Sequence, residues 1–342
     1  MENYTPIYKI TDEILTSAYE IAADLERINI IRENALTPEL RKENRIKTIH
    51  SSLWIEANSL TLQQVTDIVN GKRVSGPAKD ILEVKNAITA YDELLDCDPY
   101  NEKDLLKQHA LLMNGLVENA GKYRNAGVGV FSGNVPIHIA PPHSQVTILM
   151  SQLLEWVKNA KLPQVVKSCI FHYEFEFIHP FMDGNGRMGR MWQTLLLYQT
   201  NPIFAWLPVE TVVAHNQQDY YKAIRRSTTN NDSGIFAAFM LHALKEASAD
   251  FKAKYERGEI KDDKNGGVNG GVNGGVNELQ KSILSAMKDN PNITIAQIAT
   301  FLNTPKRTIE NNVRKLKDKK IIERIGADKD GRWRILDNHL NC

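Results

Sequence analysis

Apolar residues recur every three or four positions along most of the first 255 residues, and this spacing predicts a mainly α-helical protein. We expect helices over residues 11–31, 38–51, 78–95, 102–117, 145–158, 165–178, 191–198, 211–226 and 235–255. The helix over 165–178 is apolar on almost every side, which predicts that it lies buried at the centre of the fold. His172 on this helix is interpreted as a core histidine and not as a ligand.

One stretch departs from the helical pattern. Between residues 123 and 143, apolar and polar residues alternate on both sides of Gly133-Asn134, which predicts a β-hairpin. Such a hairpin either packs as a small sheet against the helices or offers a free strand edge to an extended partner segment. Its leading apolar residues are Val128, Val130 and Phe131. Arg124, just before the hairpin, is interpreted as structural.

The C-terminal part of the chain has its own pattern. Residues 265–277 read NGGVNGGVNGGVN, a composition typical of a flexible linker. Helical spacing returns over residues 278–288, 294–302 and 305–319, and the short turn between the last two is typical of a helix-turn-helix. Two short apolar runs on either side of Asp330-Gly331 predict a hairpin, and therefore a wing.

This C-terminal domain carries thirteen Lys and Arg residues against eight Asp and Glu residues. Its third helix offers several polar side chains that could face a DNA groove: Lys306, Arg307, Asn311, Asn312, Arg314 and Lys315. The same modest excess of positive charge suits a dimerisation or substrate-docking surface equally well. DNA and protein partners therefore both stay open.

The composition narrows the class of protein. Hydrophobic residues make up 42% and charged residues 24%, which is ordinary for a globular protein, and the net charge of +1 points to no nucleic acid or membrane for the chain as a whole. Cys97, Cys169 and Cys342 have no metal-ligand spacing and fit a reducing compartment. The sequence shows no signal-peptide pattern and no run of roughly 20 apolar residues. We expect a cytoplasmic protein without a membrane partner, either monomeric or a homodimer.

The densest chemistry lies in residues 179–190, HPFMDGNGRMGR. Its glycines allow close backbone approach, and it leads into a helix whose N-terminal N–H groups and dipole attract phosphate oxygens. Asp183 offers the oxygen ligand that Mg²⁺ prefers. Arg187 and Arg190 fall on one face of that helix and could clamp further phosphate oxygens. His179 titrates near neutral pH and could take a proton from an attacking hydroxyl.

This stretch resembles the signature of the Fic family, HPFx(D/E)GNGRxxR, and matches it at every specified position. The resemblance implies a helical Fic bundle with a hairpin flap, which transfers AMP from MgATP to a Ser, Thr or Tyr hydroxyl of a target protein. It implies that His179 is the general base, that Asp183 holds Mg²⁺, and that the hairpin with Val128, Val130 and Phe131 holds the target segment. It further implies a nucleotide site made of Gly184, Asn185, Gly186, Arg187, Gly189, Arg190 and Tyr221.

A second string, residues 52–58, resembles the inhibitory motif of the same family, (S/T)xxxE(G/N). Ser52 and Glu56 match, whereas Ala57 departs from the usual Gly or Asn. The resemblance implies that Glu56 pairs with Arg190 in the place of the nucleotide γ-phosphate, so that the protein inhibits itself. A carboxylate can satisfy a buried guanidinium until a phosphate displaces it.

Together these observations predict four regions: an N-terminal helical region with the inhibitory helix (1–77), a Fic core (78–258), a linker (259–277) and a winged-helix domain (278–342), which resembles domains often appended to Fic proteins. The expected function is a protein adenylyltransferase that also modifies itself. Two alternatives stay open. The same site could remove AMP or transfer another nucleotidyl or phosphoryl group, or the protein could be a DNA-binding regulator with a quiescent Fic domain.

Overall fold

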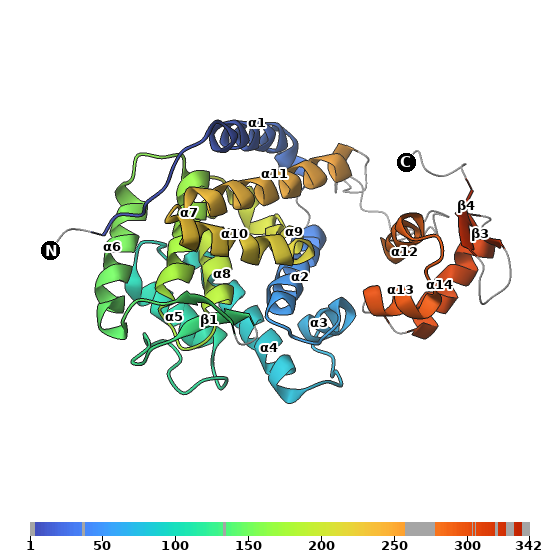
Figure 1. Ribbon diagram of the computed structural model, residues 1–342, viewed down its shortest axis with the longest axis horizontal. Helices are drawn as coiled ribbons and strands as arrows, with labels where there is room; N and C mark the ends of the chain where they lie inside the picture. Colours follow the sequence, from blue (N-terminus) through green and yellow to red (C-terminus); the bar gives the residue numbers. More distant parts are fainter. Residues whose placement is uncertain are drawn as a thin grey trace. The chain divides into compact units, whose positions relative to one another are not determined.

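The computed structural model describes residues 4–35, 38–132, 135–256, 278–302, 304, 306–318, 321–325 and 332–336. The chain forms two compact units, residues 1–266 and 267–342, and each is described here by itself (Figure 1). The predicted linker over 259–277 lies outside the described residues. Among the described residues, no helix combines the length and apolar character needed to cross a membrane.

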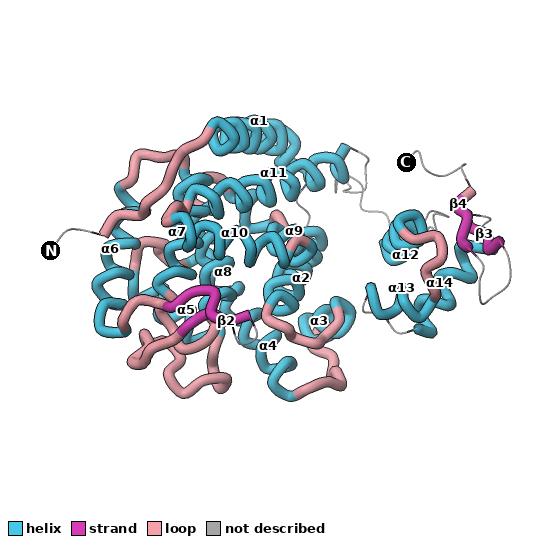
Figure 2. Tube along the Cα trace, in the orientation of Figure 1, coloured by secondary structure: helices cyan, strands magenta, loops and turns pink. Residues whose placement is uncertain are grey.

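The first unit is helical apart from one hairpin, which confirms the predicted fold class (Figure 2). Its helices are α1 (Asp12–Ala35), α2 (Pro38–Ile55), α3 (Leu62–Val69), α4 (Ala78–Glu93), α5 (Glu102–Leu112), α6 (Val146–Asn159), α7 (Gln164–Ile178), α8 (Asn185–Tyr198), α9 (Val209–His215), α10 (Gln217–Asn230) and α11 (Gly234–Glu256). Short 3₁₀ segments lie at Leu94–Asp96, His143–Gln145 and Pro202–Trp206.

Helix α7 is the centre of this unit, as its apolar sequence predicts. Its described side chains are buried nearly all round, and it packs against α6, α8 and α11. One side of α7, with Cys169 and Ile170, joins a core formed with α1, α10 and α11. The other side, with Phe171 and Phe175, joins a second core formed with α4, α5 and α8. Because α7 packs into both cores, its position is fixed, and its C-terminal end fixes the start of the signature.

Three differences between the predicted and the observed helix boundaries bear on the region of the signature. Helix α2 continues to Ile55, so Ser52 lies within it and Glu56 follows directly. Helix α5 ends at Leu112, because the chain turns through Gly115, whose φ is +69°. The predicted helix 211–226 is two helices, α9 and α10. They separate at Asn216, where the side chain donates to the Val212 carbonyl oxygen and the backbone leaves the helical region.

Helix α3 was not predicted. Its start carries a capping box, in which Thr61 Oγ1 accepts from the Gln64 backbone N–H and the Gln64 side chain accepts from the Thr61 N–H. The capping box could have been recognised in the sequence. The helix itself is only 8 residues long, so its apolar residues do not form a distinct helical pattern.

The predicted hairpin is present as β1 (Gly129–Ser132) and β2 (Val135–Ile139), which form an antiparallel two-stranded sheet. The register shifts between Val130 and Phe131, which marks a bulge. Its turn, Gly133-Asn134, lies outside the described residues, as do the side chains of Val130 and Phe131, while Val128 is half-buried.

The second unit contains α12 (Glu278–Asp289), α13 (Ile295–Phe301), α14 (Lys306–Asp318), β3 (Ile322–Ile325) and β4 (Arg332–Ile335). The two strands pair antiparallel, and Trp333 is buried with Ile309, Val313 and Leu316 of α14 in a separate core. Three helices followed by a hairpin confirm the predicted winged helix.

Candidate functional site

The signature forms a tight loop between α7 and α8. His179 ends α7 with a φ of +50°, and Gly184 begins α8 with a φ of +82°, where an added Cβ would lie 2.6 Å from the Met113 sulfur. The Asn185 side chain closes the loop, because its Oδ1 accepts from the Phe181 N–H and its Nδ2 donates to the Phe181 carbonyl oxygen, both at 2.9 Å. The Asn185 side chain is therefore committed to the loop itself.

Arg124 holds the loop from outside. Its guanidinium donates to the carbonyl oxygens of His179 at 2.8 Å and Ile178 at 3.3 Å, and also to those of Ala126 and Pro141 next to the hairpin. Arg124 is 3% exposed, so these bonds are made away from water, where an unmade one would be costly. The structural interpretation of Arg124 is confirmed.

His109 on α5 is a second support that the sequence did not reveal. Its ring stacks on Phe181 with centroids 3.6 Å apart, and its Nδ1 accepts from the Gly121 N–H at 2.8 Å. The other nitrogen, Nε2, therefore carries the proton and donates to the Asp183 carbonyl oxygen at 3.1 Å. Burial lowers the pKa of His109 to about 4, so the ring keeps this neutral form at neutral pH.

The ring of His179 is held at one of its nitrogens. Its Nδ1 lies 3.3 Å from the carbonyl oxygen of Glu176, and a carbonyl can only accept. In the neutral ring the proton therefore sits on Nδ1, which leaves a lone pair on Nε2. The lone pair of Nε2 is what a general base requires.

Asp183 and the start of α8 lie in the same loop as His179. The Asp183 side chain is about half exposed, and it contacts Arg187 Nη2 at 3.2 Å. One accessible carboxylate fits Mg²⁺, which is usually held by one or two carboxylates together with substrate phosphates and water. The first backbone N–H groups of α8, at Asn185, Gly186 and Arg187, have no acceptor within the helix and suit phosphate oxygens.

Arg187 belongs to a chain of buried polar contacts. Its Nη1 donates to Glu83 Oε1 on α4 at 3.1 Å, and both side chains are almost fully buried. Glu83 Oε2 in turn accepts from Asn58 Nδ2 at 2.8 Å. The carboxylates of Glu83 and Asp183 therefore each hold one terminal nitrogen of the Arg187 guanidinium. Glu83 is a further residue that the sequence alone did not reveal.

Arg190 makes the contact that the resemblance implies. Its Nη2 donates to Glu56 Oε1 at 2.7 Å and to the Ser52 carbonyl oxygen at 3.0 Å, and its Nε donates to Ser52 Oγ at 3.2 Å. Burial disfavours the charge of Arg190, but Glu56, Tyr220 and Glu176 together outweigh this effect and keep the pKa of Arg190 above its usual value. Arg190 Nη1 is buried without a hydrogen-bond partner, so the guanidinium retains one unused donor.

At two glycines of the signature, the space that a side chain would fill is occupied by side chains from neighbouring elements. A Cβ at Gly186 would lie 2.4 Å from Glu56 Oε1, so Glu56 can approach only because Gly186 has no side chain. A Cβ at Gly189 would lie 3.0 Å from the His172 ring and 3.2 Å from Glu176 Oε1. Gly189 thus packs α8 against α7, a role that its assignment to nucleotide binding did not anticipate.

Tyr221 and His172 differ in their surroundings. Tyr221 is half-buried, and its hydroxyl lies 3.5 Å from the Ile55 carbonyl oxygen at the end of α2. His172 is fully buried between Gln193 Oε1, at 2.7 Å, and the Tyr220 hydroxyl, at 3.2 Å. Burial lowers the pKa of His172 to about 3. His172 is the core histidine that its position predicts.

The turn after α2 explains the departure at Ala57. Asn58 N–H donates to Leu53 O and Ala57 N–H donates to Trp54 O, which is the hydrogen-bond pattern of a Schellman cap. Such a cap needs a left-handed residue, and Ala57 has a φ of +63°. Glycine and asparagine tolerate this conformation better than alanine.

Replacing Ala57 with glycine should therefore stabilise the protein. Left-handed backbone costs alanine roughly 1–2 kcal/mol, of which glycine's extra freedom in the unfolded chain offsets about 0.5–1 kcal/mol. We expect Ala57→Gly to raise the midpoint of thermal unfolding by about 2 °C in a unit of this size, while Ala57→Val lowers it. An Ala57→Gly protein that melts below wild type would show that the cap is not strained.

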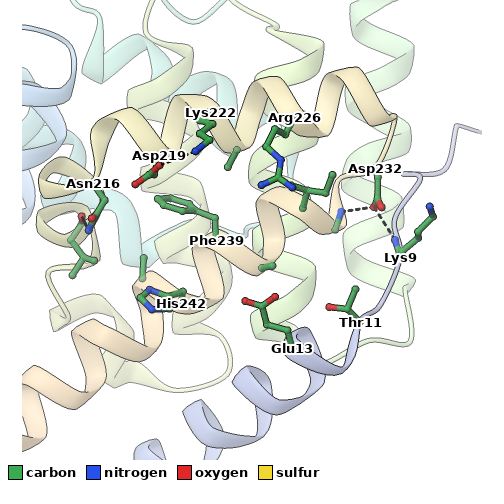
Figure 3. Close-up of a pocket in the computed structure, with 16 residues that line it drawn as sticks. Lys9, Thr11, Glu13, Asn216, Asp219, Lys222, Arg226, Asp232, Phe239 and His242 are labelled. Atoms are coloured by element: carbon green, nitrogen blue, oxygen red, sulfur yellow. Dashed lines mark hydrogen bonds and ion pairs between the residues drawn. The ribbon is translucent and has the colours of Figure 1, made fainter.

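A separate cavity of about 470 Å³ lies away from the signature, between the N-terminal segment, α10 and α11 (Figure 3). Acidic and basic side chains both face it, among them Glu13, Asp219, Lys222 and Arg226. Asp232 at its edge accepts from the Lys9 and Gly234 N–H groups and so pins the N-terminal segment. This cavity shares no residue with the signature, and its mixed charges select no ligand class.

In the winged helix, α14 presents Lys306 and Arg314 at the surface, whereas the side chains of Arg307, Asn311 and Lys315 lie outside the described residues. Asn312 was predicted to face DNA, and this is wrong. Its side chain is buried and donates to the Thr308 carbonyl oxygen within the same helix.

Comparison with known proteins extends this picture. A sequence model of the Fic/DOC family matches residues 99–197, and one of the MarR family matches residues 274–332. The chain is 27% identical over 202 residues to a protein adenylyltransferase Fic of Nematostella vectensis, with 54% of this chain and 44% of that protein covered. It is 33% identical over 133 residues to a probable protein adenylyltransferase of Aquifex aeolicus, with 37% and 39% covered. The chain thus spans less than half the length of these curated relatives.

One solved structure matches along the whole chain. The crystal structure of a Fic family protein from Desulfovibrio desulfuricans is 39% identical, with a TM-score of 0.71, and the similarity covers 98% of this chain and 99% of that one. The signature, the helical bundle and the winged helix all fall within this match. The chain described here therefore belongs to the Fic family.

Proposed function

We propose that this protein is a protein adenylyltransferase that Glu56 inhibits in the state described here. The observation that carries the proposal is the convergence of His179, Asp183 and the N-terminus of α8 in one loop, beside a buried arginine held by a carboxylate. The adenylyltransferase names of the curated relatives support the reaction type.

The transfer would proceed by in-line displacement. The oxygen of a target Ser, Thr or Tyr hydroxyl attacks the α-phosphorus of ATP while His179 Nε2 takes the hydroxyl proton. A new bond forms between that oxygen and the α-phosphorus, the bond to the oxygen bridging the α- and β-phosphates breaks, and pyrophosphate leaves. The N–H groups of α8 and Arg187 bind phosphate oxygens and offset their charge, which is the main requirement of this class of reaction.

The remaining groups bind and orient the reactants. Asp183 would hold Mg²⁺, which neutralises phosphate charge. Arg190 would bind the γ-phosphate once Glu56 has left it. Tyr221 stands beside the inhibitory turn, where a nucleotide base could stack. The hairpin would hold the target segment through a free strand edge, and a segment of a second copy or of the same chain placed there would give self-modification.

The test of this proposal is label transfer from ATP carrying ³²P at the α- or at the γ-position, with Mg²⁺ and with a chelator. We expect protein-bound label from the α-position alone, and only in the presence of Mg²⁺. Label from the γ-position would instead indicate phosphoryl transfer. Release of AMP from a target protein that already carries it, with no incorporation of label from ATP, would instead indicate hydrolytic removal of AMP, with water as the acceptor.

A second activity is supported by the match of residues 274–332 to the MarR family and by the exposed basic residues of α14. We propose that the winged helix binds DNA. The full-length protein should shift duplex DNA with an affinity that falls as salt rises, and Lys306→Ala with Arg314→Ala should weaken this binding and reduce its salt dependence. Binding unaffected by both changes would favour a protein-docking role.

A further inference from the structure

Glu176 is a buried acid that the mechanism above does not use. It lies one turn before His179 on α7 and is 7% exposed. Its Oε1 is buried without a hydrogen-bond partner, while its Oε2 lies 3.8 Å from His179 Nδ1. A buried carboxyl group with an unpaired oxygen costs stability, so its position next to the proposed base calls for a functional account.

The groups around Glu176 come from four elements. Arg190 faces it from α8, Glu56 from the turn after α2, Tyr220 from α10, and His179 from the end of α7 itself. Burial raises the pKa of Glu176 to about 8, the Arg190 charge opposes this rise, and the Glu56 charge adds to it. Gly189 provides the space, since a Cβ there would lie 3.2 Å from Glu176 Oε1.

We propose that Glu176 is a positioning residue for His179, which holds the imidazole ring and stabilises the imidazolium formed during transfer. The inference rests on the proposed function. When Nε2 takes the target hydroxyl proton, Nδ1 keeps its own proton and the ring becomes a cation. That cation faces the carbonyl oxygen and the Oε2 of Glu176, both acceptors. The proton on Nε2 passes to water after the product leaves.

This arrangement has a pH signature. Only the ionised carboxylate stabilises the imidazolium, and it forms as pH rises through the pKa of Glu176. Transfer should therefore increase as pH rises through about 8, beyond the increase that comes from forming neutral His179. Because the two groups interact closely, they should titrate as a pair with two macroscopic steps.

The first measurement is the pH profile of AMP transfer in protein that also carries Glu56→Gly. Glu176→Gln keeps the shape of the side chain and removes its charge. We expect the maximal rate at pH 8.5 to fall on the order of tenfold, the equivalent of one pKa unit, with the KM for ATP unchanged and the rise that follows ionisation of Glu176 lost. Because Glu56→Gly removes a charge that raises the pKa of Glu176, this rise should lie below pH 8 in the parent of this series. Glu176→Asp should retain that rise.

Glu174→Gln is the matched control. Glu174 is buried on the same helix, and burial raises its pKa to about 7, but its carboxylate binds the Tyr4 hydroxyl and does not face His179. We expect this variant to keep the pH profile of the parent. An equal loss in both variants, or a Glu176→Gln protein with the parental profile, would overturn the proposal.

A second readout does not depend on AMP transfer. The His179 ring resonances, followed by NMR against pH, should show two titration steps in the parent and in Glu176→Asp but a single step in Glu176→Gln. Two steps in Glu176→Gln would overturn the coupling. Two steps in the parent and one in Glu176→Gln, in protein that never transfers AMP, would leave the coupling standing and refute the proposed function instead.

Discussion

Glu56→Gly should raise the rate of AMP transfer on the order of 10- to 100-fold. Glu56 Oε1 holds Arg190 Nη2 at 2.7 Å, and a hydrogen bond between charged groups contributes about 1.5–3 kcal/mol. Under the proposed function, a nucleotide has to displace this contact before its γ-phosphate can bind. Since about 1.4 kcal/mol corresponds to a factor of ten, removing the carboxylate should increase the fraction of protein in which Arg190 can bind a γ-phosphate by one or two orders of magnitude.

The measurement is incorporation of α-phosphate label by Glu56→Gly and wild-type protein at equal ATP. Glu56→Gln should give an intermediate rise, because an amide keeps the shape but loses the charge. Glu43→Ala on α2, the helix that precedes Glu56, serves as the control and should match wild type, because the Glu43 carboxylate pairs with Lys47 at the surface. Equal rates for Glu56→Gly and wild type would show that the Arg190 contact does not limit transfer.

His179→Ala in the Glu56→Gly protein should lower transfer on the order of 10²- to 10⁴-fold, which is the usual contribution of a general base. Nucleotide binding should persist, because α8, Asp183 and the arginines remain in place. The rates are compared by label incorporation, and ATP binding by calorimetry. Exposed His215 at the end of α9 is the matched control, and His215→Ala should transfer AMP normally. Transfer by His179→Ala within a few-fold of its parent would remove His179 from the mechanism.

Much of the fold and the site could be predicted from the sequence because the relevant signals are local. The all-round apolar character of residues 165–178 predicts the buried helix α7, and the order of residues 179–190 places a base, a carboxylate and a helix N-terminus within a few positions of each other. The pairing of Glu56 with Arg190, by contrast, followed from resemblance alone. No pattern in the two segments reveals a contact across 134 positions.

The sequence analysis missed Glu83 and His109, which support the site, because each lies far along the chain from the residue that it contacts. Glu83 reaches Arg187 from 104 positions away, and His109 reaches Asp183 from 74. On helices α4 and α5 each is one polar residue among several, and only the folded chain shows that it is buried. Glu176 was the exception, because Glu174 and Glu176 stand among the aromatic residues of a mostly apolar helix, and the burial of these carboxyl groups could have been questioned from the sequence.

The turn that follows α2 is attached to both arginines of the signature at once. Glu56 binds Arg190 directly, and Asn58 reaches Arg187 through Glu83. Substituting Glu56 cuts the first attachment and leaves the second intact. Moving the whole turn breaks the Glu56–Arg190 contact and the Asn58–Glu83 contact together, while Glu83 and Asp183 keep their contacts with Arg187. Substitution of Glu56 and displacement of the whole turn are therefore different perturbations, because only the second also removes the hydrogen bond that Asn58 donates to Glu83.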